Sequence, residues 1–360
     1  MGEIYVGLMS GTSADAIDAA AIEIDGTGIR LLHTYSQPLT ENLRQRIYEV
    51  TTGDNDRLEN IFSLNLALGA AFADAALELI TGLDRPPRAI GCHGQTVRHC
   101  PERQFTVQLA SGAVLATRTG ITTVTDFRSG DLALGGQGAP LAPAFHQAVF
   151  SSTTEERAIV NIGGIANITH LSPSGKVFGF DTGPGNTLLD HWYRRHRSGP
   201  FDRDGTWAAS GVLIRPLLDR LLADAYFQAS PPKSTGLEHF NLDWLQAHLD
   251  GSEAALDVQA TLVALTAGSI ADAVHDHAPQ TTALYLCGGG ALNGELVRQL
   301  QAHLEEVPIR TTLALGIAPQ WVEACVFAWL AHRRLCGQAG NIPAVTEAIR
   351  PAVLGAVYPP

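Results

Sequence analysis

The feature of this sequence that most constrains its fold is an order of elements that occurs twice. Each half opens with three short strands and then alternates helices with strands. The strands that open the two halves are predicted at Ile4–Met9, Ala19–Asp25 and Ile29–Tyr35, and at Arg157–Ile162, Ile165–Leu171 and Lys176–Phe180. The repetition lies in topology and not in sequence. It predicts an α/β fold of two similar lobes, each with a mixed sheet opened by a three-strand meander.

The rest of each half supplies the alternating elements. In the first half these are helices at about 40–50 and 57–81, strands Ala89–His93 and Phe105–Leu109, a helix capped by Ser111, and strand Ile121–Asp126. In the second half they are a helix from about Thr187, a helix at 257–277, strand Ala283–Cys287, a helix from about Asn293, strand Ile309–Thr312 and a helix at 320–335. We therefore expect an N-terminal lobe at 1–152 and a C-terminal lobe at 153–360, the latter with an insertion at about 198–245. The last helix can pack back on the N-terminal lobe.

Composition excludes several classes of function. With 45% hydrophobic residues among 360, the chain can bury a large core, and its net charge of −12 argues against non-specific nucleic-acid binding. The five cysteines are scattered without a CxxC, so neither a disulfide framework nor a zinc site is expected. The N-terminus lacks the pattern of a signal peptide, and no run of about 18 apolar residues indicates a membrane span. A cytoplasmic protein is expected.

Three glycine-rich turns follow predicted strands. They are Gly11-Thr12-Ser13, Asn161-Ile162-Gly163-Gly164, and Cys287-Gly288-Gly289-Gly290-Ala291-Leu292-Asn293. Glycine lets backbone amides approach a phosphate closely, and the third turn also leads into a helix N-terminus. Each alone can be an ordinary tight turn, but three at matching places favour a bound nucleotide. The sequence has neither a GxxxxGK[ST] P-loop nor a GxGxxG after its first strand.

Asp181 is the strongest candidate for a reactive group. It ends a predicted strand and precedes Gly183-Pro184-Gly185, which favours a rigidly held carboxylate facing a crevice. The alternative is an N-cap of the next helix, although Asn186 or Thr187 is better placed for that role.

Three further segments carry candidate residues, each with a plainer alternative. His93-Gly94-Gln95-Thr96 closes a strand as a ligand-facing loop or as a turn with a surface histidine. Arg128 can grip a carboxylate of a ligand, or form an ion pair with Asp126 or Asp131. Glu323, on a late helix, is a site residue or a solvated helix residue.

Nine motifs in a fixed order resemble one known family. They are Gly7–Ser13 (GLMSGTS), His93–Thr96 (HGQT), Asp126–Arg128 (DFR), Gly135–Leu141 (GGQGAPL), Asn161–Asn167 (NIGGIAN), Asp181–Asn186 (DTGPGN), Pro231–Gly236 (PPKSTG), Asp257–Thr261 (DVQAT) and Trp321–Ala324 (WVEA). Together they resemble anhydro-N-acetylmuramic acid kinase over nearly the whole chain. That family belongs to the sugar kinase/heat-shock protein/actin superfamily, whose members have two ribonuclease H-like lobes with the active-site cleft between them.

The resemblance implies a reaction. The enzyme would convert 1,6-anhydro-N-acetylmuramic acid, ATP and water to N-acetylmuramic acid 6-phosphate and ADP, in peptidoglycan recycling. Asp181 matches the catalytic aspartate, and Mg²⁺ is expected with ATP. A homodimer is also implied.

The resemblance also assigns residues to ligands. The ATP-binding residues are Gly11, Thr12, Ser13, Ala14, Asp15, Ala16, Ile17 and Asp18, to which the glycine turns add Asn161, Gly163, Gly164, Gly288, Gly289, Gly290 and Asn293. The resemblance places Arg128 and Glu323 near the sugar, and the polar segment that closes the strand adds His93, Gln95 and Thr96 as substrate-binding residues. The metal ligands stay open among Asp15, Asp18 and nearby carboxylates.

The sequence departs from the family at four positions: Ala16, Leu237, Gln320 and Glu347. Ala16 and Glu347 stand where glycine is common. Ala16 would lower the affinity for ATP if its backbone required a positive φ.

The implied chemistry needs a base for water. In the anhydro sugar O6 is bridged to C1, so water attacks C1 with Asp181 as its base, and the departing O6 accepts the γ-phosphoryl group. An aspartate with the ordinary pKa near 3.9 is a weak base, and it can serve only as C1 gains oxocarbenium character. Two other hypotheses remain: a conventional sugar kinase acting on a free hydroxyl, and an ATP-driven binding machine.

Overall fold

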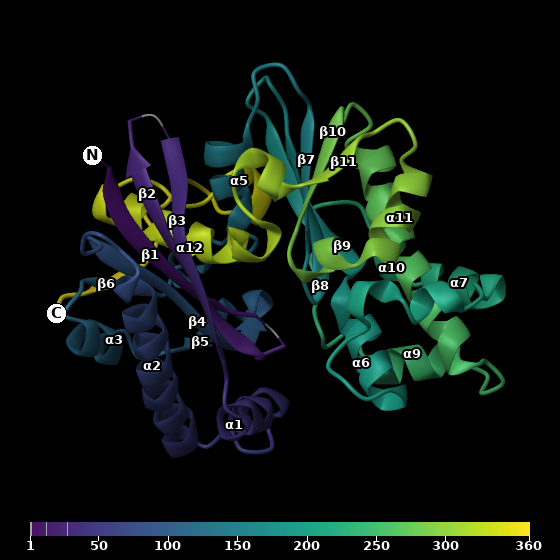
Figure 1. Ribbon diagram of the computed structural model, residues 1–360, viewed down its shortest axis with the longest axis horizontal. Coiled ribbons are helices and arrows are strands. Elements are labelled where there is room, and N and C mark those ends of the chain that lie inside the picture. The colour runs from purple at the N-terminus through teal and green to yellow at the C-terminus, as the bar shows by residue number, and fades with distance from the viewer. Residues whose placement is uncertain (1, 12, 27) are drawn as a thin grey trace. The chain divides into compact units, whose positions relative to one another are not determined.

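A computed structural model describes residues 2–11, 13–26 and 28–360 (Figure 1). Two compact units form: Met1–Val149 together with Trp321–Pro360, and Phe150–Gln320. Residues 321–360 therefore pack in the first unit, whereas the predicted C-terminal lobe included them and allowed only the last helix to pack back.

The first unit is built on a mixed sheet. Its strand order is β12-β6-β4-β1-β2-β3, and β5 pairs with β4. The strands are β1 (Glu3–Ser10), β2 (Ala16–Asp25), β3 (Gly28–Pro38), β4 (Ala89–Cys100), β5 (Phe105–Leu109), β6 (Thr123–Thr125) and β12 (Ala356–Tyr358). Strands β1, β2 and β3 form an antiparallel meander, and β4 lies parallel to β1 and β6.

The second unit repeats this arrangement. Its sheet has the order β11-β10-β7-β8-β9, made of β7 (Arg157–Ile162), β8 (Ile165–Leu171), β9 (Val177–Pro184), β10 (Ala283–Cys287) and β11 (Ile309–Thr311). Again three antiparallel strands are followed by two parallel ones, since β10 lies parallel to β7 and β11. The predicted fold class, with a meander opening each mixed sheet, is confirmed.

The helices of the first unit are α1 (Glu41–Thr52), α2 (Leu58–Thr81), α3 (Gly112–Thr119), α4 (Ser129–Leu132), α5 (Ala142–Phe150), α12 (Val322–Leu335) and α13 (Pro343–Thr346). Of these, α2 and α12 pack on the central strands of the first sheet. Helix α12, yellow in Figure 1, packs on β1 and β4. At Gly91 of β4 a Cβ atom would lie 2.0 Å from the carbonyl oxygen of Phe327, so glycine permits this close approach. Alternation along β1 directs Val6 and Leu8 into the core that α2 covers.

Helix α2 also meets the criteria for a membrane span by length and composition, alone among the described helices. Its buried side chains, among them Leu64, Leu68 and Phe72, belong to the core of the first unit, as in the core helix of a soluble protein. The length and composition of α2 are therefore only weak evidence of a membrane span.

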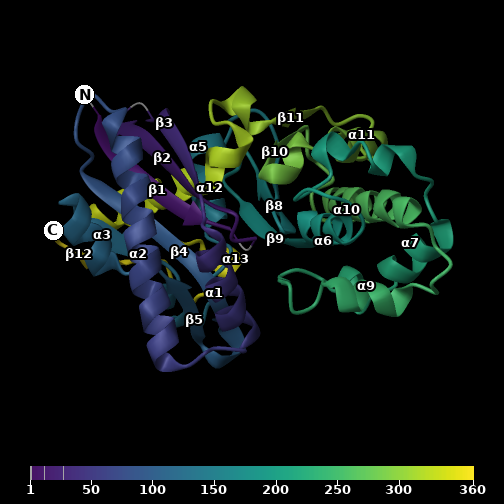
Figure 2. The same cartoon turned by 60° about the horizontal axis from the view of Figure 1, so that its bottom comes forward.

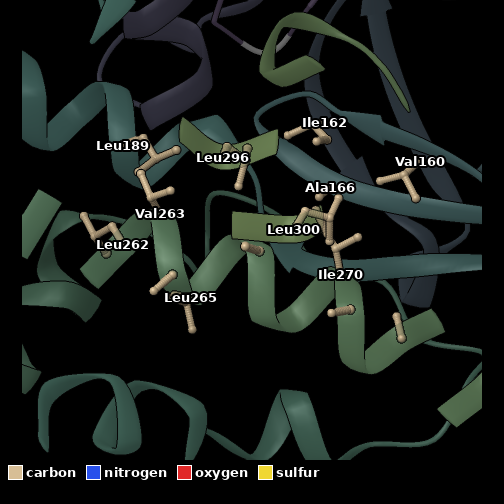
Figure 3. Close-up of a cluster of buried hydrophobic side chains, with 14 of the residues drawn as sticks. Val160, Ile162, Ala166, Leu189, Leu262, Val263, Leu265, Ile270, Leu296 and Leu300 are labelled. Atoms are coloured by element: carbon tan, nitrogen blue, oxygen red, sulfur yellow. The ribbon is translucent and has the colours of Figure 1, made fainter. Parts of the chain in front are cut away.

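The second unit has its own hydrophobic core around α10. Its helices are α6 (Asn186–His196), α7 (Arg215–Leu222), α8 (Ala225–Gln228), α9 (Leu242–His248), α10 (Ala255–His277) and α11 (Gly294–His303). Figure 2 shows α10 with α6, α7 and α9 nearby in the same unit. In Figure 3, Leu262, Val263 and Ile270 of α10 lie among side chains of the strands and of α6 and α11. Leu217, Leu221 and Leu245, from the predicted insertion at 198–245, belong to the same core.

One predicted loop is wrong. His93–Thr96 do not leave the strand, because β4 continues to Cys100 and pairs with β5. These polar residues are compatible with a strand because their side chains find partners inside the unit.

Candidate active site

Asp181 lies in β9 at an irregular point of the second sheet. The register between β8 and β9 shifts here, because Asn167 pairs with Asp181 whereas Ala166 pairs with Gly183. Such bulges redirect a side chain and are frequent near active sites. Asp181 does not cap the next helix, since the N-cap of α6 is Gly185. The alternative interpretation of Asp181 as a helix cap is therefore wrong.

The surroundings of the Asp181 carboxylate alter its acidity. The residue is half-buried, and the backbone amide of Thr235 donates to its Oδ2 at 3.1 Å. Burial raises the pKa of Asp181 to about 7, the Thr235 amide opposes this rise, and the charge of Glu238 adds to it. A carboxylate with this pKa is a far better base at neutral pH than an ordinary aspartate.

Two of the predicted glycine turns meet in the second unit. Strands β7 and β10 are neighbours, with Asn161 beside Cys287, so the turns that follow them lie together. Gly288 has a φ of +79°, and a Cβ atom there would lie 2.4 Å from Asn161 Oδ1. Asn186 of α6 joins them by donating from Nδ2 to the carbonyl of Ile162 at 2.9 Å.

The carbonyls of Gly163 and Gly164 accept hydrogen bonds from the first backbone amides of α6. The amide of Asn186 donates to the Gly163 carbonyl at 2.8 Å, and that of Thr187 to the Gly164 carbonyl at 3.1 Å. The carbonyls of this turn therefore face α6, which fixes the turn in one conformation.

The N-terminus of α11 is occupied by protein groups. Asn293 is the N-cap and accepts from the amide of Leu296 at 3.1 Å, while Asp204 Oδ1 accepts from the amide of Gly294 at 2.9 Å. An anion at this helix start would compete with Asp204. In the described part of the chain no carbonyl accepts from the amides of Gly289 and Gly290, so these amides are the better candidates for a phosphate.

The predicted ATP-binding segment of the first unit joins β1 to β2. Ala14 adopts a φ of +51°, and its amide donates to the Gly11 carbonyl at 3.0 Å. Thr12 lies outside the described residues. Ala16 begins β2 and is not among the positive-φ residues, so the condition under which it would impair ATP binding is not met.

The acidic side chains of this segment have different partners. Asp15 follows Ser13 and Ala14 in this segment. Its Oδ1 lies 3.6 Å from Arg44 Nη2 in an exposed ion pair. Asp18 accepts from Ser36 Oγ at 2.7 Å, and burial raises the pKa of Asp18. Ile17 is fully buried in the core and presents no side chain to a ligand.

Gln95 supports the same segment. It is buried, accepts from Ser10 Oγ at 2.8 Å, and donates to the Gly11 carbonyl at 3.3 Å. Thr96 instead accepts from Gln108 of β5 at 3.2 Å. Gln95 thus holds the turn between β1 and β2.

His93, Arg128 and Glu323 come together in the first unit. Arg128 donates from Nε and Nη2 to His93 Nε2 at 3.1 and 3.0 Å, and from Nη1 to the Gly138 carbonyl at 2.8 Å. His93 Nδ1 lies 3.0 Å from the carbonyl of Gly94, so these partners place the proton on Nδ1. The alternative of a surface histidine is wrong, because His93 is buried.

The charges of this group follow from burial. Burial and the positive charge of Arg128 lower the pKa of His93 well below its usual range, so the ring is neutral. Burial also lowers the pKa of Arg128 to about 10, while the charges of Glu323 and Asp131 oppose that change. No ion pair joins Arg128 to Asp126 or Asp131 among the described residues, since Asp131 instead accepts from Asn341 and Thr346.

A cavity of about 490 Å³ lies beside His93 within the first unit. This volume is in the usual range for small-molecule pockets. Its lining combines polar groups with aromatic rings and includes Asn65, Gln108, Asp126, Phe62 and Tyr358. Such a lining suits a polar small molecule with one apolar face.

Comparison with known proteins decides the family. The family model described as anhydro-N-acetylmuramic acid kinase matches residues 3–360. The chain belongs to the anhydro-N-acetylmuramic acid kinase family. The anhydro-N-acetylmuramic acid kinase of Nitrosomonas europaea is 50% identical over 360 residues, and that of Saccharophagus degradans is 47% identical over 368 residues, each alignment covering 99% of both chains. The predicted family is confirmed.

Among solved structures, the activator of 2-hydroxyisocaproyl-CoA dehydratase from Clostridium difficile with bound ADPNP has a TM-score of 0.47 and 14% identity. The match covers 94% of this chain and 99% of that one.

Sequence reasoning missed the groups that hold Asp181. They are Tyr226, Lys233 and Thr235, all in the segment predicted to be an insertion. The run Pro231-Pro232-Lys233 marks this segment in the sequence, and the Lys233 carbonyl accepts from the Asp181 amide in the folded chain.

Proposed function

We propose that this chain is an ATP-dependent kinase that opens 1,6-anhydro-N-acetylmuramic acid with water and phosphorylates O6, giving N-acetylmuramic acid 6-phosphate and ADP. Its place is peptidoglycan recycling in the cytoplasm. Family membership over the whole chain confirms the predicted class of enzyme, a phosphotransferase with an alcohol group as acceptor. The observation that carries the mechanism is the Asp181 carboxylate, held at the β9 bulge with its pKa raised to about 7.

Asp181 acts as the base for water. Water attacks C1, its proton passes to the carboxylate, and the C1–O6 bond breaks. O6 attacks the γ-phosphorus of ATP, and ADP leaves with the electron pair of the bond that breaks. A base with a pKa near the working pH combines the correct protonation state with sufficient basicity, which removes the difficulty posed by an ordinary aspartate.

Backbone amides bind the phosphates. Phosphoryl transfer depends mainly on positioning and on neutralisation of charge. We assign this role to the Gly11–Asp18 segment of the first unit, and to Asn161, Gly163, Gly164 and Gly288–Gly290 of the second. The support is the rigid packing of these turns and the amides of Gly289 and Gly290. Asn293 contributes by capping α11 and holding the end of its turn.

Mg²⁺ fits Asp18 better than Asp15. The described residues contain no group of three or more metal-ligating side chains, and Mg²⁺ usually needs only one or two carboxylates beside phosphates and water. Burial raises the pKa of Asp18, so a cation would compensate its desolvated charge, whereas Asp15 already lies near Arg44. When bound, Mg²⁺ neutralises charge on the phosphates.

The sugar site includes the His93 group. The polar lining of the cavity beside His93 favours contact with hydroxyl and acetamido groups, while Arg128 donates to the His93 ring and holds it in place. The charge of Glu323 acts on Arg128. Gln95 and Thr96 contribute to this site indirectly, because Gln95 holds the turn after β1 and Thr96 bonds to Gln108 of β5. The homodimer stays a prediction.

The test is a paired assay with ATP and either the anhydro sugar or open-ring N-acetylmuramic acid. The proposal expects turnover of the anhydro sugar and far less of the open form. Preference for the open form would instead assign a conventional sugar kinase.

A further inference from the structure

The segment Asp224–Glu238, called the 224–238 segment below, contacts Asp181 at three different atoms. The Tyr226 hydroxyl donates to the Asp181 carbonyl at 2.6 Å. The Asp181 amide donates to the Lys233 carbonyl at 3.2 Å, and the Thr235 amide donates to Oδ2 at 3.1 Å. Backbone and side chain of Asp181 are thus held by one element.

The position of Asp181 explains why such support is needed. β9 is an edge strand, and its register with β8 shifts at Asp181. A bulge on an edge leaves backbone groups without ladder partners. The 224–238 segment provides those partners at this one point of β9.

Tyr226 is itself fixed on several sides. Lys233 Nζ lies 4.8 Å from the centre of the Tyr226 ring and donates to the Tyr226 carbonyl at 3.1 Å, while Phe240 packs edge-on at 5.5 Å. Burial and the Asp181 charge raise the pKa of Tyr226, so its hydroxyl stays protonated and remains a donor.

Asp224 anchors the start of the segment. Its carboxylate accepts from the Tyr226 amide at 2.9 Å and from Trp244 Nε1 at 2.8 Å, and it lies 3.1 Å from His239 Nε2. The segment is therefore tied to α9 and its preceding turn, not only to β9.

We propose that Tyr226 is a positioning residue for Asp181: through its hydroxyl it keeps the carboxylate bound to the Thr235 amide by Oδ2, so that Oδ1 receives the proton from water. This proposal rests on the proposed function in taking Asp181 as the base. Among the described residues no group donates to Oδ1. The charged neighbours on the same segment are Glu238 and Lys233.

The test compares Tyr226→Phe with Tyr193→Phe. Tyr193 packs edge-on to Trp207, and within the described residues its hydroxyl has no hydrogen bond, so this control removes a hydroxyl without touching Asp181. We expect Tyr226→Phe to lower kcat by about 10- to 100-fold with the KM for ATP within about twofold, and to move the acid limb of the pH–rate profile to higher pH. The control should match the wild type. A Tyr226→Phe enzyme with wild-type kcat and an unmoved acid limb would overturn the proposal.

A second variant keeps the test decisive if Tyr226→Phe does not fold. Glu238 is exposed, and Glu238→Gln removes a charge that raises the pKa of Asp181, so the acid limb should move to lower pH. An unmoved limb would show that Asp181 does not set the acid limb, and the proposal fails with that premise. Titration of ¹³C-labelled aspartate carboxyls by NMR gives the Asp181 pKa without substrate. A higher Asp181 pKa in Tyr226→Phe than in the wild type supports the positioning role, and an unchanged pKa overturns it, even if the wild-type enzyme proves inactive on the anhydro sugar, which would refute only the proposed function.

Discussion

Replacing Asp181 with asparagine should abolish turnover and at the same time stabilise the second unit at alkaline pH. The difference between a folded-state pKa of about 7 and the ordinary value of 3.8, at about 1.4 kcal/mol per pH unit, corresponds to about 4 kcal/mol of destabilisation by the ionised carboxylate. Because Asp181 is only half-buried, solvent screens part of this, and we expect a gain of about 2–3 kcal/mol for Asp181→Asn at pH 8. The asparagine Oδ1 can still accept from the Thr235 amide.

The sign of the pH dependence follows from the raised pKa. Between pH 3.8 and about 7 the folded state holds the proton that the unfolded chain has lost, so wild-type stability falls as pH rises through this window. The cost of the charge is fully present above pH 7 and nearly absent at pH 4. The advantage of Asp181→Asn should therefore shrink to less than about 0.5 kcal/mol at pH 4.

The measurement is urea unfolding at pH 4, 6 and 8, followed by tryptophan fluorescence. Trp192, Trp207 and Trp244 lie in the second unit and report its unfolding. Asp219→Asn is the matched control, since Asp219 is exposed on α7 and its loss should change stability by less than about 0.5 kcal/mol at every pH. An Asp181→Asn protein no more stable than the wild type at pH 8, or a gain independent of pH, would refute the reasoning.

Three further substitutions test the glycine turns and the departures from the family. Gly288→Ala should destabilise the second unit by about 2 kcal/mol or more, because Gly288 has a positive φ and a Cβ atom there would contact Asn161. It should also weaken ATP binding measured by calorimetry, and an unchanged affinity would exclude this turn from the ATP site. Ala16→Gly should leave ATP affinity within about twofold, since Ala16 begins an ordinary strand, and a larger change would contradict the described backbone. Glu347→Gly should stabilise the first unit by about 0.5–1 kcal/mol in thermal unfolding, because Glu347 ends α13 with a φ of +66°; a lower Tm would show that its bond from Gln137 matters more.

Much of the fold could be predicted because local signals agreed with tertiary structure. Apolar runs located β7 and β10 to the residue, Ser111 is the helix cap that was predicted, and α11 begins directly after Asn293, close to its predicted start. The extension of β4 was missed. Its polar residue Gln95 is satisfied by Ser10 and Gly11, which are remote in sequence, so no local pattern reveals the strand.

The candidate site was predicted only where one segment carried the whole signal. Asp181 stood out because it follows a predicted strand and precedes Gly183-Pro184-Gly185. The predicted strand end was wrong, since β9 continues to Pro184. Its partner Tyr226 lies 45 residues away, and nothing in the sequence around Tyr226 indicates that its hydroxyl reaches β9. The partners of Arg128 were also not predicted. The sequence suggested an ion pair with Asp126 or Asp131, whereas the folded chain places His93 and the Gly138 carbonyl beside its guanidinium.

The most direct test of the central claim follows oxygen from water. The reaction is run briefly in ¹⁸O-water, before spontaneous exchange at the anomeric carbon, and the products are analysed by mass spectrometry. If Asp181 is the base for a water that attacks C1, the label lies on C1 of the phosphorylated sugar, and the phosphoryl group carries none. Label in inorganic phosphate, or an unlabelled phosphorylated sugar, would contradict this mechanism.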